Sequence, residues 1–309
     1  MVDLILFGDC KETLKQFPRK SAQMCVTSPP YYGLRDYGGE ANQIGQEETP
    51  EEFVNNLVEV FREVRDVLKD DGVLWLNIGD SYYNYRPGTG GLPKQTVSKT
   101  SQDLPTQCNR RANKLDGLKE KDLIGIPWML AFALRADGWY LRQDIIWHKP
   151  NPMPESVKDR CTKSHEYLFL LSKNKKYYYD NEAIKEPVKQ DWGTRNRDAG
   201  KYHNPGTGLQ PHSGLTKSYE RKNKRDVWTI TNKPYKGAHF AVFPPDLIEP
   251  CILAGSERGD IILDPFMGSG TTGMVAKKHG RNYIGCELHE DYASLQTDRI
   301  DSIPCQLVL

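Results

Sequence analysis

Hydrophobic runs long enough to cross a membrane are absent from this sequence. Nowhere among the 309 residues do 18 apolar residues follow one another. Residues 1–7 contain no basic run and no small-residue cleavage site, so they do not resemble an export signal. We therefore expect a soluble protein of the cytoplasm, long enough at 38% hydrophobic residues to bury one sizeable α/β core.

Cysteine is sparse, and neither sign of charge is in large excess. The seven cysteines form no Cys-x-x-Cys pair, which argues against a disulfide framework and against a structural zinc site. We expect no bound metal. The net charge of +1 does not by itself indicate a nucleic-acid-binding protein, so such an activity has to be read from local clusters.

Short apolar runs alternate with helical patterns along the chain. The clearest helical pattern covers Pro50–Lys69 and follows Thr49, a residue type that caps helix N-termini. Because strand and helix signals alternate, we predict a doubly wound α/β sheet. The runs typical of buried parallel strands are Leu4–Phe7, Met24–Thr27, Val73–Ile78, Ile145–Trp147, Tyr167–Leu171, Ile261–Leu263 and Tyr283–Cys286.

Two polar stretches interrupt this alternation. The first, within residues 86–120, is rich in Gly, Ser, Thr, Gln and Asn. The second, Lys185–Asp226, is glycine-rich and has more basic than acidic residues. We interpret both as excursions from the core. The alternative, that they are solvated loops without a role, applies more strongly to the first.

A proline-stiffened loop, Ser28-Pro29-Pro30-Tyr31, follows the predicted strand Met24–Thr27. Two prolines cannot continue a strand ladder, so the chain leaves the sheet at the strand's carboxyl end, where open α/β sheets hold ligands. The Ser28 hydroxyl and the Pro29 carbonyl are two acceptors beside a tyrosine ring, which suits a planar base that bears an amino group. Read alone, the run is equally typical of a turn or a polyproline segment.

A glycine-rich turn follows the predicted strand Ile261–Leu263. In the run from Asp264 to Gly273, backbone N–H groups can point at a ligand with no Cβ in the way. The run lacks the lysine of a phosphate-binding P-loop. Its glycines match the dinucleotide spacing, so a nicotinamide enzyme stays an alternative on this fragment alone. Glu287 ends the next predicted strand, at the spacing of a carboxylate that binds ribose hydroxyls.

Together, Ser-Pro-Pro-Tyr at 28–31 and Asp-Pro-Phe-x-Gly-Ser-Gly-Thr-Thr at 264–272 resemble the amino-methylating DNA methyltransferases. The order of the two runs, target loop first, is similar to the beta class of that family. The resemblance covers most of the chain except the two polar stretches, and it implies a mostly parallel, seven-stranded S-adenosylmethionine-dependent methyltransferase sheet with a small polar DNA-recognition insertion. Further stretches that fit are Gly8-Asp9, Trp139–Arg142, Lys149–Asn151, Ser164–Tyr167 and His239–Pro244.

The resemblance also implies a division of labour along the chain. Residues 1–184 would form the catalytic half with the target-base loop, and 229–309 the cofactor-binding half of the same domain. Residues 185–228 would recognise the target. The residues implied to line S-adenosylmethionine are Asp9, Thr27, His239, Phe240, Phe243, Asp264, Pro265, Phe266, Gly268, Ser269, Gly270, Thr271, Thr272 and Glu287.

The expected reaction is a direct methyl transfer to an exocyclic amino group. The lone pair of such a nitrogen is delocalised into the base, and acceptance of its hydrogens by Ser28 Oγ and the Pro29 carbonyl would free it. Transfer in line then depends on positioning and electrostatics. The base must leave the duplex, and Tyr31 is the residue expected to stack on it; a core aromatic is the alternative role for Tyr31.

Serine before Pro-Pro-Tyr favours the N4 of cytosine as the target, with the N6 of adenine as the alternative. Methylation at carbon 5 requires a cysteine nucleophile, and neither Pro304-Cys305 nor Pro250-Cys251 has the setting of a catalytic loop. Ser164-His165-Glu166 lacks a nucleophile-elbow sequence, so a hydrolytic site is not expected. A DNA-binding protein without catalysis and a nicotinamide oxidoreductase are the remaining alternatives.

The expected partner is double-stranded DNA, bound through the second polar stretch, where aromatic residues lie between basic ones. A cognate restriction endonuclease is a further expected partner, and both a monomer and a homodimer are compatible with the sequence. The basic residues expected to contact DNA are Arg195, Arg197, Lys201, Arg221, Lys222, Lys224 and Arg225.

Overall fold

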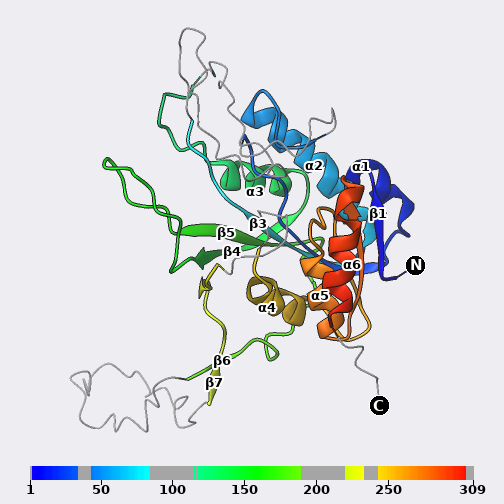
Figure 1. The fold of residues 1–309 in the computed structure, drawn as a ribbon. Helices are drawn as coiled ribbons and strands as arrows, with labels where there is room; N and C mark the ends of the chain where they lie inside the picture. The colour runs from blue at the N-terminus through cyan, green and yellow to red at the C-terminus, as the bar shows by residue number, and fades with distance from the viewer. Residues whose placement is uncertain are drawn as a thin grey trace, which may run out of the picture.

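The computed structural model describes residues 2–33, 43–83, 115, 117–188, 220–232 and 243–303. An eight-stranded sheet runs through them in the order β1-β10-β9-β2-β3-β5-β4-β8 (Figure 1). Its strands are β1 (Leu4–Phe7), β2 (Ala22–Thr27), β3 (Leu68–Ile78), β4 (Tyr140–His148), β5 (His165–Ser172), β8 (Val227–Thr229), β9 (Ile261–Asp264) and β10 (Asn282–Glu287). The helices are α1 (Cys10–Thr13), α2 (Pro50–Val67), α3 (Ile126–Ala136), α4 (Pro245–Gly255), α5 (Thr271–Lys278) and α6 (Ala293–Asp301), with 3₁₀ turns at Leu14–Gln16 and Glu290–Tyr292.

All seven predicted strands are present, but one runs the other way. The sheet is mostly parallel, whereas β5 is antiparallel to both β3 and β4, so the expectation that Tyr167–Leu171 is a parallel strand is wrong. No helix lies between β4 and β5, and a chain that returns without a crossover must pair antiparallel. The eighth strand, β8, was not predicted; it has three residues, too few for a pattern, and pairs parallel with β4.

The predicted helix begins where its cap signal places it. The Thr49 side chain accepts from Glu52 N at 3.1 Å, and the Glu52 carboxylate accepts from Thr49 N at 3.3 Å. This reciprocal capping satisfies two donors at the start of α2. The helix ends at Val67, earlier than predicted, because Leu68 already begins β3.

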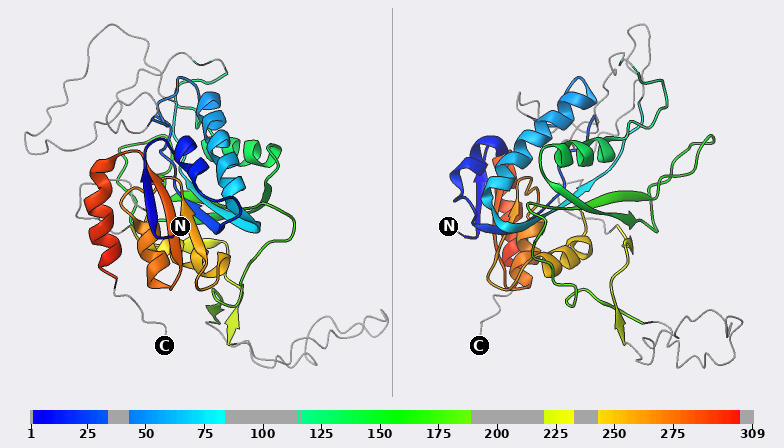
Figure 2. Two further views of the ribbon diagram at one scale, coloured as in Figure 1. Left: turned by 90° about the vertical axis from the view of Figure 1, so that its right-hand side faces the viewer. Right: turned by 180° about the vertical axis from the view of Figure 1, so that it is seen from behind.

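Helices cover both faces of the sheet (Figure 2). Side chains of β2 alternate between two buried cores: Cys25 joins the core under α2 and α3, while Met24 and Val26 join the core against α4. Burial on both faces explains why the strands read as unbroken apolar runs. Within the described ranges, no helix combines the length and apolarity needed to cross a bilayer.

Two segments extend away from this body in Figures 1 and 2. Residues 149–164 join β4 to β5 and project beyond the sheet. In the second polar stretch, β6 (Glu186–Pro187) pairs antiparallel with β7 (Arg221–Lys222) in a short ribbon. Most of the first polar stretch lies outside the described residues.

Candidate functional site

The two motif loops leave neighbouring strands at the same edge of the sheet. β2 and β9 are adjacent and parallel, with Cys25 opposite Leu263. The proline-stiffened loop begins after Thr27 and the glycine-rich loop after Asp264. The Thr27 hydroxyl donates to Asp264 Oδ1 at 2.6 Å, and both side chains are buried. The loops predicted to hold target base and cofactor therefore start from one hydrogen-bonded pair.

Asp264 organises the start of the glycine-rich loop. Besides the bond from Thr27, its carboxylate accepts from Thr272 Oγ1 at 2.6 Å and from Phe266 N at 3.0 Å. The three bonds favour the ionised form. Burial outweighs them and raises the pKa of Asp264 to about 6. The loop is thus folded around a buried, multiply bonded carboxyl group.

Two glycines allow the loop to turn into α5. Gly268 has φ of 52° and Gly270 has φ of 78°, in the left-handed region that a side chain disfavours. A Cβ on Gly270 would lie 3.3 Å from Gln296 Cα of α6. Gln296 in turn donates to the Gly268 carbonyl at 2.7 Å. Helix α6 therefore packs against the glycine-rich loop and holds it through Gln296.

Glu287 lies at the carboxyl end of β10, beside the same loop. Its Oε2 accepts from Gly268 N at 2.7 Å and its Oε1 from His289 N at 3.1 Å. Burial raises the pKa of Glu287. Asp9 follows the neighbouring strand β1; its side chain accepts from Lys11 N at 2.8 Å and caps α1. The structure thus brings Glu287 to the loop and shows a structural role for Asp9.

Two buried polar atoms at this site have no hydrogen-bond partner in the described part of the chain: Thr271 Oγ1, at the start of α5, and His289 Nε2. Buried polar groups are nearly always paired, so these two atoms are candidates for contact with a polar ligand. His289 was not predicted from the sequence. Its position two residues after Glu287 was the available signal.

The Ser-Pro-Pro-Tyr loop carries a half-buried Ser28 and a buried Pro29. Tyr31 points into the protein, where its hydroxyl donates to Glu166 Oε2 at 2.6 Å. A second contact joins the same hydroxyl to Asn77 Oδ1 at 3.3 Å. Lys149 forms an ion pair with Glu166. The ring of Tyr31 is thereby held by a network of side chains from β3, from β5 and from Lys149, the residue that follows β4.

Glu166, Lys149 and Asn77 were missed as site residues. Lys149 and Glu166 lie within stretches that fit the family resemblance, but nothing in the sequence indicated that they face Tyr31. They meet because β4 and β5 pair antiparallel, with His148 opposite His165. The Tyr31 ring also lies against Gly79, where a Cβ would come within 2.7 Å of Tyr31 Cε2.

The remaining predicted cofactor residues are placed as follows. Pro265 is buried, Phe266 is half-buried against the core under α2, and Phe243 packs against the core of α4. Ser269 is buried and accepts from Arg299 Nη1 at 2.5 Å. His239 and Phe240 lie outside the described residues.

The basic residues of the second polar stretch are partly engaged within the protein. Arg225 and Lys224 pair with Glu186 at 3.2 and 3.8 Å, and Arg221 donates to the Lys185 carbonyl at 2.9 Å. Of these, Arg221 and Arg225 are exposed. The predicted DNA contacts Arg195, Arg197 and Lys201 lie outside the described residues, whereas Lys222 lies in β7.

The rejected cysteine and hydrolytic sites remain unsupported. Cys251 is buried inside α4, and burial raises its pKa well above the usual range, the opposite of what a thiolate nucleophile needs. Glu166 is engaged by Lys149 and Tyr31. Cys305 lies outside the described residues.

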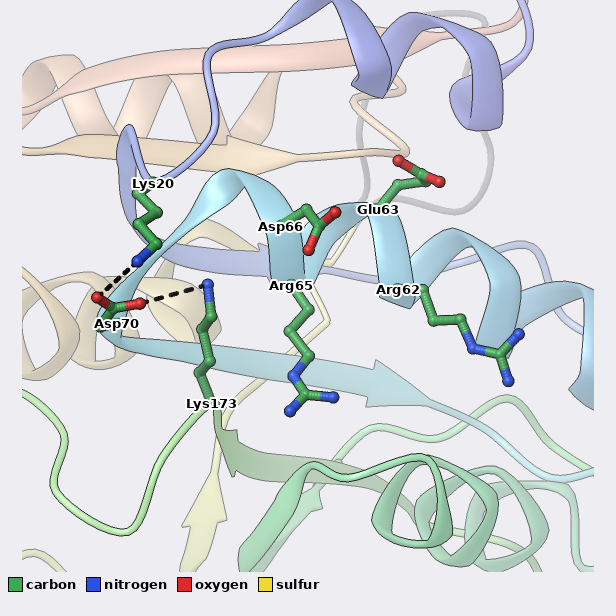
Figure 3. A pocket seen from close by; sticks show the side chains of 7 residues that line it. All are labelled: Lys20, Arg62, Glu63, Arg65, Asp66, Asp70 and Lys173. Carbon is green, nitrogen blue, oxygen red and sulfur yellow. Dashed lines mark hydrogen bonds and ion pairs between the residues drawn. The ribbon is translucent and has the colours of Figure 1, made fainter.

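A charged hollow of about 410 Å³ lies at the opposite edge of the sheet. It is lined by residues near the amino ends of β2 and β3 and by the last turns of α2 (Figure 3). Asp70 there pairs with Lys20 at 2.9 Å and with Lys173 at 3.9 Å. Because its charges compensate one another and it is remote from both motif loops, we do not assign the reaction to it.

Comparisons with known proteins agree with this geometry. The family model described as "DNA methylase" matches residues 22–298. The chain is 48% identical over 296 residues to the type II methyltransferase M.SmaI of Serratia marcescens, covering 96% of this chain and 90% of that protein. It is 46% identical over 293 residues to the type II methyltransferase M.Cfr9I of Citrobacter freundii, covering 95% and 86%.

Solved structures show the same fold. The PvuII DNA methyltransferase, described as cytosine-N4-specific, has a TM-score of 0.61 at 19% identity, over 96% of this chain and 88% of that one. A Thermus thermophilus protein, described as a "Putative DNA Modification Methylase" and solved in complex with S-adenosyl-L-methionine, has a TM-score of 0.59 at 24% identity, over 98% of this chain and 95% of that one. The chain belongs to the DNA methylase family and is a DNA methyltransferase of the beta class of N6/N4 amino-methyltransferases.

Proposed function

We propose that this enzyme transfers the methyl group of S-adenosylmethionine to the N4 amino group of cytosine in double-stranded DNA. The observation that carries the proposal is the buried bond from Thr27 to Asp264, at 2.6 Å. It sets the acceptors of the Ser-Pro-Pro-Tyr loop beside the glycine-rich loop. A single methyl transfer between two ligands requires this proximity.

The residues at the glycine-rich loop fit the proposed cofactor. Each Glu287 oxygen already accepts one backbone N–H, and a carboxylate oxygen has a further lone pair for a ribose hydroxyl. The unpaired Thr271 hydroxyl and the N-terminus of α5 are suited to the carboxylate end of a methionine group. Bound there, S-adenosylmethionine supplies an electrophilic methyl group.

On the target side, Ser28 Oγ and the Pro29 carbonyl would accept the two hydrogens of the amino group. This draws the nitrogen toward tetrahedral geometry and frees its lone pair for attack. Neither acceptor becomes covalently bonded to the base. Since serine is a poor base, the proton leaves late, to water. Tyr31 would line the pocket for the extruded base with its ring fixed by Glu166.

The choice of cytosine over adenine rests on Ser28. In the family that this chain resembles, serine before Pro-Pro-Tyr, rather than aspartate or asparagine, favours the N4 of cytosine as the target. Methylation of adenine N6 is the second candidate. The N4 specificity of the PvuII enzyme belongs to that protein, and at 19% identity the likeness concerns the fold.

The two similar proteins M.SmaI and M.Cfr9I are type II methyltransferases. We propose that this enzyme likewise works in the cytoplasm within a restriction–modification system, beside an endonuclease of the same specificity. DNA would be recognised by residues 185–228, whose exposed Arg221 and Arg225 lie at the β6–β7 ribbon.

The test is to methylate DNA with the purified enzyme, digest the product to nucleosides and identify the modified one by mass. N4-methylcytosine is expected. N6-methyladenine would transfer the proposal to the second candidate, and absence of methylation by a folded enzyme would overturn it. In parallel, Ser28→Ala should lower kcat by about 10²-fold while the affinity for S-adenosylmethionine, measured by calorimetry, stays that of the parent. Binding of NAD in place of S-adenosylmethionine would point to an oxidoreductase instead.

A further inference from the structure

An exposed methionine lies on the arm formed by residues 149–164. Met153 is 83% exposed, more than any other large hydrophobic side chain in the described part of the chain, where Val227 at 56% follows. The arm projects from the body in Figure 1 and in the right-hand view of Figure 2. Pro152 and Pro154 flank the methionine and restrict its backbone. Single exposed hydrophobic side chains are common on protein surfaces, so any role of Met153 follows from its place and attachment and not from its exposure alone.

The arm is held on both of its sides. Lys149 N donates to the Ser164 carbonyl at 2.7 Å and closes the base of the arm. Asn151 exchanges two hydrogen bonds with Asn232, at 3.1 and 3.0 Å, just beyond β8. These contacts fix the backbone on the β8 side within two residues of Met153.

On its other side, the arm is attached to the segment between β3 and α3. Lys163 Nζ donates to the Asp80 carbonyl at 2.6 Å. Arg160 stacks over the ring of Tyr82, 4.0 Å from its centroid, and Asp159 pairs with Lys121 at 2.7 Å. An arm tied at this many points presents Met153 in a defined place rather than as a loose tail.

The arm begins at the reaction site. Lys149, its first residue, pairs with Glu166, and Glu166 accepts from the Tyr31 hydroxyl. Met153 is four positions after Lys149 in the chain, so their Cα atoms are at most about 14 Å apart. A base held against Tyr31 and the duplex it came from are therefore both within reach of this arm.

The charge of the arm suits a polyanion. Its four basic residues exceed its two acidic ones, Glu155 and Asp159, by two, as counted over residues 149–164. Lys158 is exposed. DNA phosphates attract such a surface, whereas a hydrophobic partner protein would favour a broader apolar patch than one methionine between two prolines.

We propose that Met153 is the wedge that enters the DNA duplex and fills the place of the extruded base. This inference rests on the proposed function, because it requires a base to leave the stack. Extrusion costs a few kcal/mol of unstacking, and apolar side chains, methionine and proline among them, insert between base steps in other DNA-bending proteins. The thioether adapts to an irregular gap, and the flanking prolines limit the entropy lost on insertion.

The experiment compares Met153→Ala with the parent on two synthetic duplexes that carry the site the parent methylates. In one the target base is paired, and in the other it faces an abasic position, so that it is already partly unstacked. On the paired duplex, we expect kcat/KM of Met153→Ala to fall about tenfold or more, since tenfold corresponds to about 1.4 kcal/mol of lost wedge energy. On the second duplex, the two proteins should agree within about threefold.

Two further variants separate a wedge from a general defect. Met153→Leu keeps an apolar side chain of similar size and should stay near the parent. Tyr140→Ala removes a 44% exposed aromatic at the other end of β4 and should leave both substrates unaffected. Equal rates for Met153→Ala and the parent on paired DNA overturn the inference alone, as does an equal loss on both duplexes. A parent enzyme that methylates no DNA overturns the proposed function and the wedge together.

Discussion

The Thr27 hydroxyl donates to Asp264 Oδ1 at 2.6 Å, across 237 residues of sequence. Each residue ends a strand, and the two strands are neighbours in the middle of the sheet. The bond is buried, so it is not exchanged for one with water. It joins the starts of the two loops that we propose hold the target base and the cofactor.

Thr27→Val tests this connection. Valine keeps the shape of threonine but leaves the buried carboxylate short of a donor, which should cost about 1–3 kcal/mol of unfolding free energy and lower kcat/KM for methylation. Thr27→Ser retains the hydroxyl and serves as the control, with a small packing loss of about 1 kcal/mol. Urea unfolding and initial methylation rates measure both effects. If the Thr27→Val enzyme methylates DNA as fast as the Thr27→Ser enzyme, the hydrogen bond between Thr27 and Asp264 does not contribute to the reaction.

The buried Asp264 predicts how stability changes with pH. Its pKa is about 6 in the folded protein, against 3.8 for an unperturbed side chain. The folded state therefore binds this proton more tightly than the unfolded chain does, and stability falls as pH rises between about 4 and 6. The difference corresponds to about 3 kcal/mol. The Asp264→Asn variant has no carboxyl group at this position, so this contribution to the pH dependence of its stability is absent.

The measurement is urea unfolding of parent and Asp264→Asn at steps from pH 4 to pH 7. The free energy of unfolding of the variant, relative to the parent, should increase over this range and level off above about pH 6. Titrations shared by both proteins cancel in the difference. Two parallel pH profiles would show that Asp264 titrates near its ordinary value in the folded protein.

The bond from Tyr31 to Glu166 predicts that the two side chains act as a unit. Tyr31→Phe and Glu166→Gln should each lower kcat, and the double variant should be little worse than either, with a coupling energy of about 1–2 kcal/mol. Tyr32→Phe is the matched control, since the Tyr32 hydroxyl donates to the Glu48 carbonyl at 3.2 Å, in an exposed contact outside this network. Single-turnover methylation rates measure the cycle. Additive losses would mean that Glu166 does not act through Tyr31.

Gly270 should tolerate no side chain, because a Cβ there would crowd helix α6 in addition to straining the backbone. Gly270→Ala and Gly259→Ala both place alanine at positive φ, 78° and 85°, at a cost of about 1–2 kcal/mol. Only at Gly270 would the new Cβ also meet a neighbour, Gln296 Cα at 3.3 Å, whereas Gly259 faces open space. We expect Gly270→Ala to weaken S-adenosylmethionine binding about tenfold in calorimetry and Gly259→Ala to leave it unchanged. The Tm should also fall further for Gly270→Ala than for Gly259→Ala. Equal cofactor affinities for the two variants would contradict the role of α6 in supporting the loop.

Much of the fold was readable from local signals. Apolar runs such as Met24–Thr27 located the strands because burial on both faces removes every polar position from them. Thr49 and Pro50 marked the start of α2 because capping depends on residues a single turn apart. The direction of β5 was not readable in this way, since an apolar run has the same composition in either orientation.

By itself, the sequence determined where two loops leave the sheet: the two prolines after Thr27 end the strand, and the glycines after Asp264 open a turn that other residues cannot adopt. Only the tertiary structure decided which distant side chains complete the site. Glu166 and Lys149 reach Tyr31, and Asn151 reaches Asn232, through strand pairing. Such contacts depend on register between segments far apart in the chain, and no local pattern encodes that register.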